Sequence, residues 1–321
     1  MALAGTRRSQ HRRSQRTGRP ARLVRGELRL LRRRGVEPGR TRAHMRKHAN
    51  ATEGGRMHIV ICVKQVVDPD GVNSYALWGQ LEVDGSGRAF STRLPLIINA
   101  YDDQAIEAAL RLRDEGDDVS ITAISVGGED VDQVLKHCVA MGCNEIIRLD
   151  DPEAGAGDAL RTASLLAAQI EELGDVDLVL CGRQSSDYDQ GTVPGALAEL
   201  LGFACVTLGF GVTADDGRLR VQRATPLGEE VVSVATPAVV TISNELGVPR
   251  YPTSRGMIAA RRHPPTVRTA SELEAGGGAH GVELVELFVP DVQGQCEQIE
   301  GATPAEQAAA LFARLEEEGV L

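Results

Sequence analysis

Short apolar runs alternate with amphipathic stretches along most of the chain. The runs are mostly apolar and do not alternate strictly between apolar and polar positions, a pattern typical of parallel strands covered on both faces. The stretches between them place apolar residues at helical spacing, with charge on the opposite side. The predicted strands are 58–63, 119–126, 145–149, 177–181 and 237–243, and the predicted helices are 102–115, 130–141, 158–173 and 194–201. Repeated strand-helix units predict an α/β fold with a doubly wound, mostly parallel sheet and right-handed crossovers.

Two regions depart from this alternation. Turn signals at 68–71 and 84–85 predict a loop and a hairpin before the apolar run 94–98. After Gly202 the pattern changes to shorter β runs, which we interpret as antiparallel strands or an extension at one edge of the sheet. These runs are 206–212, 218–223 and 230–234.

The last third of the chain begins with a polar stretch rich in Pro and Arg, residues 244–265. It predicts an exposed loop leading to a short helix. Three glycines at 276–278 predict a flexible break, and residues 304–318 predict an amphipathic terminal helix with Thr303 as its N-cap. The expected organisation is a basic extension over 1–56, an α/β domain over 57–265 with an exposed loop at 244–258, and a C-terminal arm with a docking helix over 266–321.

Charge separates the first 56 residues from the rest. They hold 17 of the 35 Lys and Arg residues but only three of the 45 acidic residues, so we expect disorder there. A basic binding arm, an Arg-rich organellar presequence and upstream sequence included by a wrongly placed start are three explanations, and we favour the last because a buried strand follows Met57. The expected location is then the cytoplasm, or the mitochondrial matrix if the segment is a presequence.

The remaining residues, 57–321, carry 18 basic against 42 acidic side chains, a formal net charge of −24. Nucleic acid is therefore an unsuitable partner for this part, which favours partners with basic patches. No stretch approaches the roughly 18 to 20 apolar residues of a membrane helix, so we expect a soluble globular protein. The six cysteines form no CxxC pair, which favours a reducing compartment and buried thiols over a metal site.

Ligands of open α/β sheets bind beyond the carboxyl ends of the strands. That rule selects Cys62–Lys64, Asn99–Asp102 and the loop Gly182–Thr192. The loop leads from a predicted strand to a predicted helix, so its backbone N–H groups and the helix N-terminus favour phosphate binding. An ordinary strand-to-helix connection has the same composition, and from the residues alone both interpretations stay open.

Familiar catalytic and nucleotide motifs are missing from the sequence. No GxGxxG follows the first strand and no GxxxxGK[ST] occurs, so neither a Rossmann dinucleotide site nor a P-loop is indicated. The histidines lack a neighbouring Ser or Cys in a nucleophile elbow. Asp187 and Asp189 are a possible acid and base pair, but we interpret them as residues that fix the loop geometry. The sequence predicts no active site of its own.

Several sequence motifs stand out along the chain. They are Val63-Lys64-Gln65-Val66, Asn99-Ala100-Tyr101-Asp102 with Ala105-Ile106-Glu107, Ala140-Met141-Gly142, Gly182-Arg183-Gln184 with Asp187 and Asp189, and Pro237-Ala238-Val239-Val240-Thr241 with Pro249-Arg250-Tyr251. Together these motifs resemble one family, the beta subunits of electron-transfer flavoproteins. They occur in the family's order over nearly all of 57–321. The resemblance implies a sheet of the adenine-nucleotide-binding type.

The resemblance also implies a function. Such a subunit forms a heterodimer with a larger alpha subunit that holds FAD, accepts electrons from acyl-CoA or other flavin dehydrogenases, and passes them to a quinone oxidoreductase. It is then an electron carrier and not an enzyme alone. In this family the beta subunit binds AMP in a buried structural role. Transferred to matching positions, the AMP contacts are Cys62, Asn99, Ala100, Tyr101, Asp102, Val126, Gly182, Arg183, Gln184, Ser185, Ser186, Asp187, Tyr188, Asp189, Gln190, Gly191, Thr192 and Val193.

The family's partner-recognition loop falls on the predicted exposed loop. The matching residues are Pro249, Arg250, Tyr251, Pro252, Thr253, Ser254, Arg255, Gly256, Met257 and Ile258. Many members place an anchoring leucine where this chain has Ser254, followed by Arg255, so the resemblance leaves the dehydrogenase partner open. Ala224 stands where an acidic residue is common, and Pro69 where respiratory members have a tyrosine.

There are three alternatives to an AMP-binding carrier subunit. Some family members bind a second FAD at the AMP position and split electron pairs between two acceptors, and Gln65 with Asn99-x-Tyr101-Asp102 is closer to that group. A stand-alone nucleotide-binding protein of the universal-stress type shares the expected fold, but the long extension after Gly202 argues against it. A nucleotide-hydrolysing or adenylating enzyme is disfavoured because no catalytic constellation is found.

Overall fold

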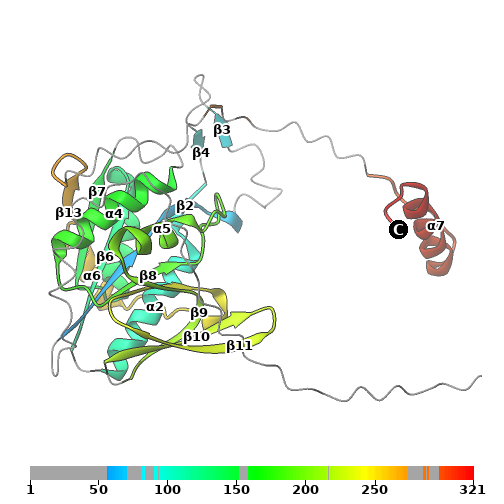
Figure 1. The fold of residues 1–321 in the computed structure, drawn as a ribbon. Helices are drawn as coiled ribbons and strands as arrows, with labels where there is room; N and C mark the ends of the chain where they lie inside the picture. The colour runs from blue at the N-terminus through cyan, green and yellow to red at the C-terminus, as the bar shows by residue number, and fades with distance from the viewer. Residues whose placement is uncertain are drawn as a thin grey trace, which may run out of the picture. The chain divides into compact units, whose positions relative to one another are not determined.

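A computed structural model gives the structure of the chain (Figure 1). It describes residues 56–70, 81–83, 90–92, 94–116, 118–151, 158–215, 217–273, 285–286, 288 and 296–321. The predictions for residues 1–55 and for the glycine break at 276–278 lie outside these described residues. Everything below concerns the part of the chain from residue 56 onward.

Nine of the described strands form one sheet in the order β11-β10-β9-β12-β8-β1-β6-β7-β13. Its strands are β1 (Met57–Cys62), β6 (Val119–Val126), β7 (Glu145–Asp150), β8 (Leu178–Gly182), β9 (Ala204–Asp215), β10 (Arg218–Thr225), β11 (Gly228–Ala235), β12 (Ala238–Ile242) and β13 (Thr266–Thr269). Pairing is parallel from β9 to β13, and antiparallel where β10 joins β9 and β11. The predicted doubly wound, mostly parallel sheet with an antiparallel extension is confirmed.

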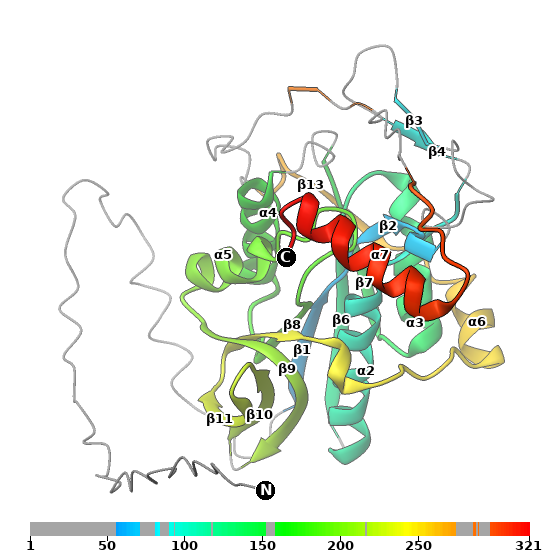
Figure 2. The ribbon, with the colours of Figure 1, turned by 90° about the vertical axis from the view of Figure 1, so that its right-hand side faces the viewer.

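Helices cover both faces of the sheet, as Figure 2 shows. On one face α2 (Ala100–Glu115) and α3 (Asp132–Met141) pack with residues such as Ile106 and Leu135 against Ile59 of β1. On the other face α4 (Ala159–Leu173) and α5 (Thr192–Leu201) pack against Val60 and Val179. Neighbouring residues of each strand therefore enter different cores, which explains why the strands are apolar at every position.

Two small antiparallel pairs lie outside the main sheet. The strand β2 (Gln65–Val67) pairs with β5 (Leu96–Ile98), and β3 (Leu81–Val83) pairs with β4 (Phe90–Thr92). The second pair is the predicted hairpin. A short 3-10 helix, η2 (Glu129–Val131), leads into α3, and another, η4 (Asn244–Leu246), follows β12.

The region after β12 contains the predicted short helix and a strand that was not predicted. The helix is α6 (Ser254–Ala260), which begins inside the predicted loop 244–258 because Thr253 accepts a hydrogen bond from the N–H of Gly256, and which buries Ala260. Residues 266–269 were assigned to the arm, yet they form β13 beside β7. A four-residue polar strand carries no apolar run, so the pattern gave no signal for it.

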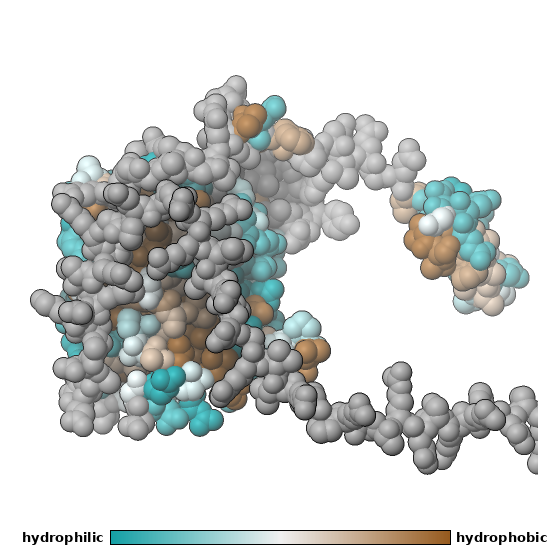
Figure 3. All heavy atoms as spheres, in the orientation of Figure 1, coloured by the Kyte–Doolittle hydropathy of each residue, from teal (hydrophilic) through white to brown (hydrophobic). Residues whose placement is uncertain are grey.

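The predicted terminal helix is present as α7 (Pro304–Glu317), and Thr303 caps it by accepting a hydrogen bond from Glu306 N–H. Its exposed apolar side chains, Leu311 and Phe312 among them, share the helix with charged residues (Figure 3). Among the described helices, none combines the length and apolar character that a membrane crossing requires. Of the cysteines, Cys62, Cys138, Cys143 and Cys181 are buried, whereas Cys205 and Cys296 are exposed.

Candidate functional site

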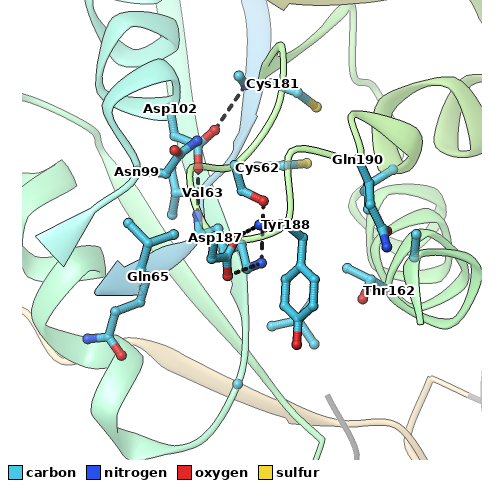
Figure 4. Close-up of a pocket in the computed structure, with 18 of the residues that line it drawn as sticks. Cys62, Val63, Gln65, Asn99, Asp102, Thr162, Cys181, Asp187, Tyr188 and Gln190 are labelled. Atoms are coloured by element: carbon cyan, nitrogen blue, oxygen red, sulfur yellow. Dashed lines mark hydrogen bonds and ion pairs between the residues drawn. The ribbon is translucent and has the colours of Figure 1, made fainter. Parts of the chain in front are cut away.

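A cavity of about 1020 Å³ opens at the carboxyl ends of β1, β6 and β8. Four segments line it: the residues after β1, the start of α2, the turn between β6 and η2, and the loop between β8 and α5, here called the 182–191 loop. The first turns of α4 close another side. Figure 4 shows side chains from these segments converging on the same space. The cavity therefore lies at the edge of the sheet that the strand-end rule predicts.

Asp102 joins three of these segments at the cavity floor. Its side chain is buried, and its Oδ2 accepts a hydrogen bond from the backbone N–H of Lys64 at 2.8 Å while Oδ1 accepts one from that of Gly182 at 3.0 Å. Burial raises the pKa of Asp102 to about 7, although these N–H groups and the Asn99 side chain all favour the carboxylate. The carboxyl group is thus held by neutral donors and titrates near neutral pH.

Asn99, immediately before α2, fixes the 182–191 loop from the same side. Its side-chain Nδ2 donates to the carbonyl of Gln184 at 2.9 Å, and its Oδ1 accepts from the N–H of Ser186 at 3.3 Å. A Cβ on Gly182 would lie 2.3 Å from Asp102 Oδ1 and 2.7 Å from Tyr101 Cβ, so only glycine permits this approach. The start of α2 is therefore the support on which the loop rests.

The 182–191 loop is also shaped from within. Asp189 adopts a positive φ of 51° and accepts a hydrogen bond from Gln184 Nε2 at 3.0 Å. Asp187 accepts one from the N–H of Tyr188 at 2.9 Å. Gly191 has a φ of 58°, and a Cβ there would lie 2.9 Å from the carbonyl of Arg183. These contacts agree with the expected geometric role of the two aspartates.

The N-terminus of α5 faces the cavity without a side-chain cap. Its N-cap is Gly191, no side chain accepts from its first N–H groups, and Thr192 and Val193 line the cavity. By contrast, Asp158 caps α4 by accepting from the N–H groups of Leu160 and Arg161. Unsatisfied N–H groups and the positive end of the helix dipole favour an anion such as phosphate beside Thr192.

Lys64 is the one cation among the cavity-lining residues that the structure describes. Its Nζ lies 2.6 Å from Asp187 Oδ2 and 3.4 Å from Ser185 Oγ, and 5.0 Å from the centre of the Tyr188 ring. The remaining charges of this lining are carboxylates, those of Asp102, Asp130, Asp151, Asp158 and Asp187. An anionic ligand therefore has one ammonium group and one helix N-terminus with which to interact.

The structure brings most of the predicted site residues together. Those that line the cavity are Cys62, Asn99, Asp102, Val126, Gly182, Gln184, Ser185, Asp187, Tyr188, Gln190, Gly191, Thr192 and Val193. Those of the predicted set that are not among its lining residues are Ala100, Tyr101, Arg183, Ser186 and Asp189. Arg183 instead lies 5.4 Å from the centre of the Tyr101 ring, and Asp189 supports the loop from behind.

Sequence reasoning missed the α4 side of the cavity. Thr162, Leu166 and Asp158 all line it, as do Gly127 and Gly128 of the turn after β6. A signal was present for both places, because Gly127 directly follows a predicted strand and Asp158 stands where an N-cap is expected after another. Applying the strand-end rule to every parallel strand would have included Gly127, Gly128 and Asp158, but not Thr162 and Leu166 on the helix α4.

Comparison with known proteins gives a consistent result. Residues 90–273 match the family model described as electron transfer flavoprotein domain. The chain is 32% identical over 270 residues to the caffeyl-CoA reductase-Etf complex subunit CarD of Acetobacterium woodii, covering 83% of this chain and all of that protein. It is 34% identical over 268 residues to the electron transfer flavoprotein subunit beta of Clostridium acetobutylicum, covering 82% and 99%.

The chain belongs to the electron transfer flavoprotein beta-subunit family. A more distant member, the electron transfer flavoprotein subunit beta of Mycobacterium leprae, is 26% identical over 235 residues. Membership confirms the resemblance stated from the motifs, and the family model covers the cavity-lining residues from Leu96 onward.

Exposed apolar side chains gather in the segment 248–258, here called the recognition segment. Val248 is 81% exposed and Tyr251 87%, and Met257 and Ile258 on α6 are also exposed. Pro249, Pro252 and Gly256 are half-buried, whereas Arg250, Thr253, Ser254 and Arg255 are exposed. The predicted exposure therefore holds for most of the segment.

The recognition segment is firmly attached despite its exposure. Arg250 donates through Nε to Glu107 at 2.7 Å and through Nη2 to Asp114 at 2.8 Å, so both carboxylates belong to α2. These bonds raise the pKa of Arg250; burial alone would raise the pKa of Glu107, but its hydrogen bonds lower it. A Cβ on Gly256 would lie 2.2 Å from the carbonyl of Ala140, which shows how closely α6 approaches α3.

Proposed function

We propose that this subunit holds an adenine nucleotide in the cavity and pairs with a larger, FAD-bearing alpha subunit to carry electrons from a flavin dehydrogenase to a quinone oxidoreductase. One observation carries the proposal. The uncapped N-terminus of α5 and the ammonium group of Lys64 share one cavity at the carboxyl edge of the sheet, in a chain of this family. Membership of the family supports the involvement of a flavin.

The residues present suit the two ends of such a nucleotide. At the phosphate end, the N–H groups of Thr192 and Val193 and the Lys64 ammonium supply donors and positive charge. At the other end, Val126, Val131 and Leu166 give apolar walls that exclude water from a base or ring. A flavin, when bound, supplies the capacity to accept electrons singly or in pairs. The protein residues then only bind and orient it.

The size of the cavity favours FAD over AMP. Sites for small ligands commonly enclose roughly 300 to 1,000 Å³, and about 1020 Å³ lies at the upper limit of that range. A mononucleotide would leave much of that volume unfilled, whereas a dinucleotide would occupy more of it. We therefore propose a second FAD in this subunit, with the electron-bifurcating form of the function, and AMP as the alternative.

The proposed role is that of a carrier subunit. Substrate chemistry then belongs to the dehydrogenase that donates the electrons, and this chain presents the recognition segment to it. Tyr251, Met257 and Ile258 offer an exposed apolar surface, and Arg255 beside them offers charge. Aromatic, Met and Arg side chains dominate many protein interfaces. In place of a single leucine plug, this mixed surface is the proposed contact with the dehydrogenase.

Co-expression with the FAD-bearing partner chain tests the proposal. The purified heterodimer is denatured, and the released nucleotides are separated and counted against protein. Two FAD molecules per heterodimer are expected. A ratio of one FAD and one AMP per heterodimer would mean that this subunit binds AMP, the alternative ligand, in place of a second FAD. A heterodimer that contains no adenine compound on this subunit and takes up none would contradict the proposal, and so would a chain that purifies alone with its nucleotide, as the stand-alone alternative requires.

A further inference from the structure

Lys64 combines a fixed backbone with a side chain that is free to change partners. Its N–H donates to buried Asp102 at 2.8 Å, and its carbonyl accepts from the N–H of Asn99 at 2.9 Å. Both bonds are backbone bonds, so they do not depend on the side chain. The ammonium group, by contrast, is 45% exposed, and it reaches the 182–191 loop through Asp187, which is 29% exposed. The backbone of Lys64 thus supports the site, whereas its side chain is available to interact with a ligand.

The charges around the cavity leave an anionic ligand short of positive charge. A phosphate carries up to two negative charges, and the carboxylate of Asp187 lies at the cavity wall together with the Lys64 ammonium. An ion pair between partly exposed groups is screened by water and contributes little. A bond from an ammonium to a phosphate beside a helix N-terminus is stronger, because both the charge and the dipole favour it.

We infer that Lys64 is the residue that selects phosphorylated adenine ligands, and that Asp187 is the ion-pair partner of its ammonium group while no phosphate is bound. In the empty site the ammonium pairs with Asp187. When a nucleotide enters, the ammonium turns to the phosphate at the N-terminus of α5, and Asp187 and the Tyr188 ring lose their contact with it. Asp187 therefore competes with the ligand, and an adenine compound without phosphate gains nothing from Lys64. This inference rests on the proposed function and adds the residue pair that sets its ligand class.

Isothermal titration of the nucleotide-depleted heterodimer with AMP, FAD and adenosine tests the inference. Lys64→Gln keeps both backbone bonds. It is expected to weaken the binding of AMP and FAD by about tenfold or more and to leave the binding of adenosine unchanged, since only the phosphorylated ligands lose a hydrogen bond from a charged group. Asp187→Asn is expected to tighten AMP and FAD several-fold. Lys136→Gln on α3 makes the same chemical change away from the cavity lining and is expected to change none of the three affinities.

The possible failures are distinguishable. If the parent heterodimer binds AMP or FAD and Lys64→Gln leaves their preference over adenosine unchanged, the inference is wrong and the proposed function stands. Equal losses for adenosine and AMP would also overturn it, because they would assign Lys64 a structural role. If the parent heterodimer binds none of the three compounds, the proposed function itself is wrong.

Discussion

The two ends of α2 hold two functional segments by different physical means. At its start, Asn99 and Asp102 hold the 182–191 loop through backbone N–H and carbonyl groups, in a buried setting. Further along, Glu107 and Asp114 hold Arg250 of the recognition segment through ion pairs, in a setting that is partly exposed. One helix therefore anchors both the cavity and the surface proposed for partner binding.

Because the two segments are held by different interactions, they are expected to respond differently to pH and to salt. A buried carboxyl group with neutral donors is insensitive to salt, but it is sensitive to pH because burial has moved its pKa into the neutral range. Ion pairs near the surface are sensitive to salt, because dissolved ions screen the attraction between the two charges. The cavity and the recognition segment are thus expected to be separable by solution conditions.

Gly182→Ala is expected to have the largest effect. A methyl group 2.3 Å from Asp102 Oδ1 forces the loop away from α2, and overpacking of this kind costs about 3 kcal/mol or more. Thermal unfolding and nucleotide content of the heterodimer measure it, and both should fall. The matched control is Gly195→Ala in α5, where a Cβ meets nothing within 4 Å and the helix gains from alanine. Equal stability of the two variants would contradict the close approach described here.

Asp102→Asn is expected to cost about 2 kcal/mol at pH 8, where the carboxyl group of the parent is ionised. An asparagine keeps one acceptor oxygen, but its amide meets the N–H of either Lys64 or Gly182, so one donor is left unsatisfied. Nucleotide affinity should fall with the stability, because both donors belong to segments that line the cavity. Chemical denaturation of parent and variant at fixed pH measures the difference.

The same substitution changes the pH dependence in a defined direction. The pKa of Asp102 is raised from 3.8 to about 7 in the folded chain, so its proton stabilises the fold below the lower value and that contribution is lost as pH rises through 7. Between about pH 5 and 8, the free energy of unfolding of the parent should therefore fall by more than that of Asp102→Asn. Parallel curves for the two proteins over this range would show that Asp102 does not titrate there.

Arg250→Ala is expected to cost about 1–2 kcal/mol, and less at high salt. The substitution leaves Glu107, which is almost fully buried, with Arg111 as a remaining partner at 2.9 Å. Unfolding in low and in molar salt measures the change, and the salt-dependent part should vanish in the variant. A cost that is the same at both salt concentrations would assign the effect to packing and not to charge.

Gly256→Ala is expected to have the smallest effect on global stability and a clear local one. Its Cβ meets the carbonyl of Ala140 at 2.2 Å, so α6 must shift from α3, but α6 is short and peripheral. Limited proteolysis should cut near residue 256 sooner, while the unfolding temperature changes little. Unchanged cleavage would show that α6 accommodates the methyl group in place.

The sequence was sufficient for the regular part of the fold and for the floor of the cavity. Strands such as β1 and β8 are apolar at each position because two cores contact them, and this is a direct signal of a parallel sheet. Asn99 and Asp102 stand directly before a predicted amphipathic helix, where the strand-end rule places ligands. Both were therefore predicted as site residues.

The remaining features depend on tertiary contacts that no local pattern encodes. The strand β13 is four residues long and pairs with β7 from far along the sequence. The predicted short helix, α6, begins earlier than expected, at Ser254 inside the predicted loop, where Gly256 lies close to the carbonyl of Ala140 on α3. The α4 side of the cavity contains Thr162 and Leu166, which on a helical pattern are ordinary polar and core positions. Only the packing of α4 beside β1 and β6 gives them a place in the cavity.

Two neighbouring thiols give the cavity a built-in reporter of its own occupancy. Cys62 and Cys181 are in register on adjacent strands and both line the cavity, and the hydrogen bond between them, together with burial, raises the pKa of Cys181. A neutral, buried thiol such as that of Cys181 reacts slowly with alkylating reagents, and a ligand bound in the cavity would slow both cysteines further by covering them. Exposed Cys296 reacts without regard to the ligand. Mass spectrometry, which counts the cysteines that are alkylated slowly, thus distinguishes ligand-bound from ligand-free protein without an optical signal from the ligand.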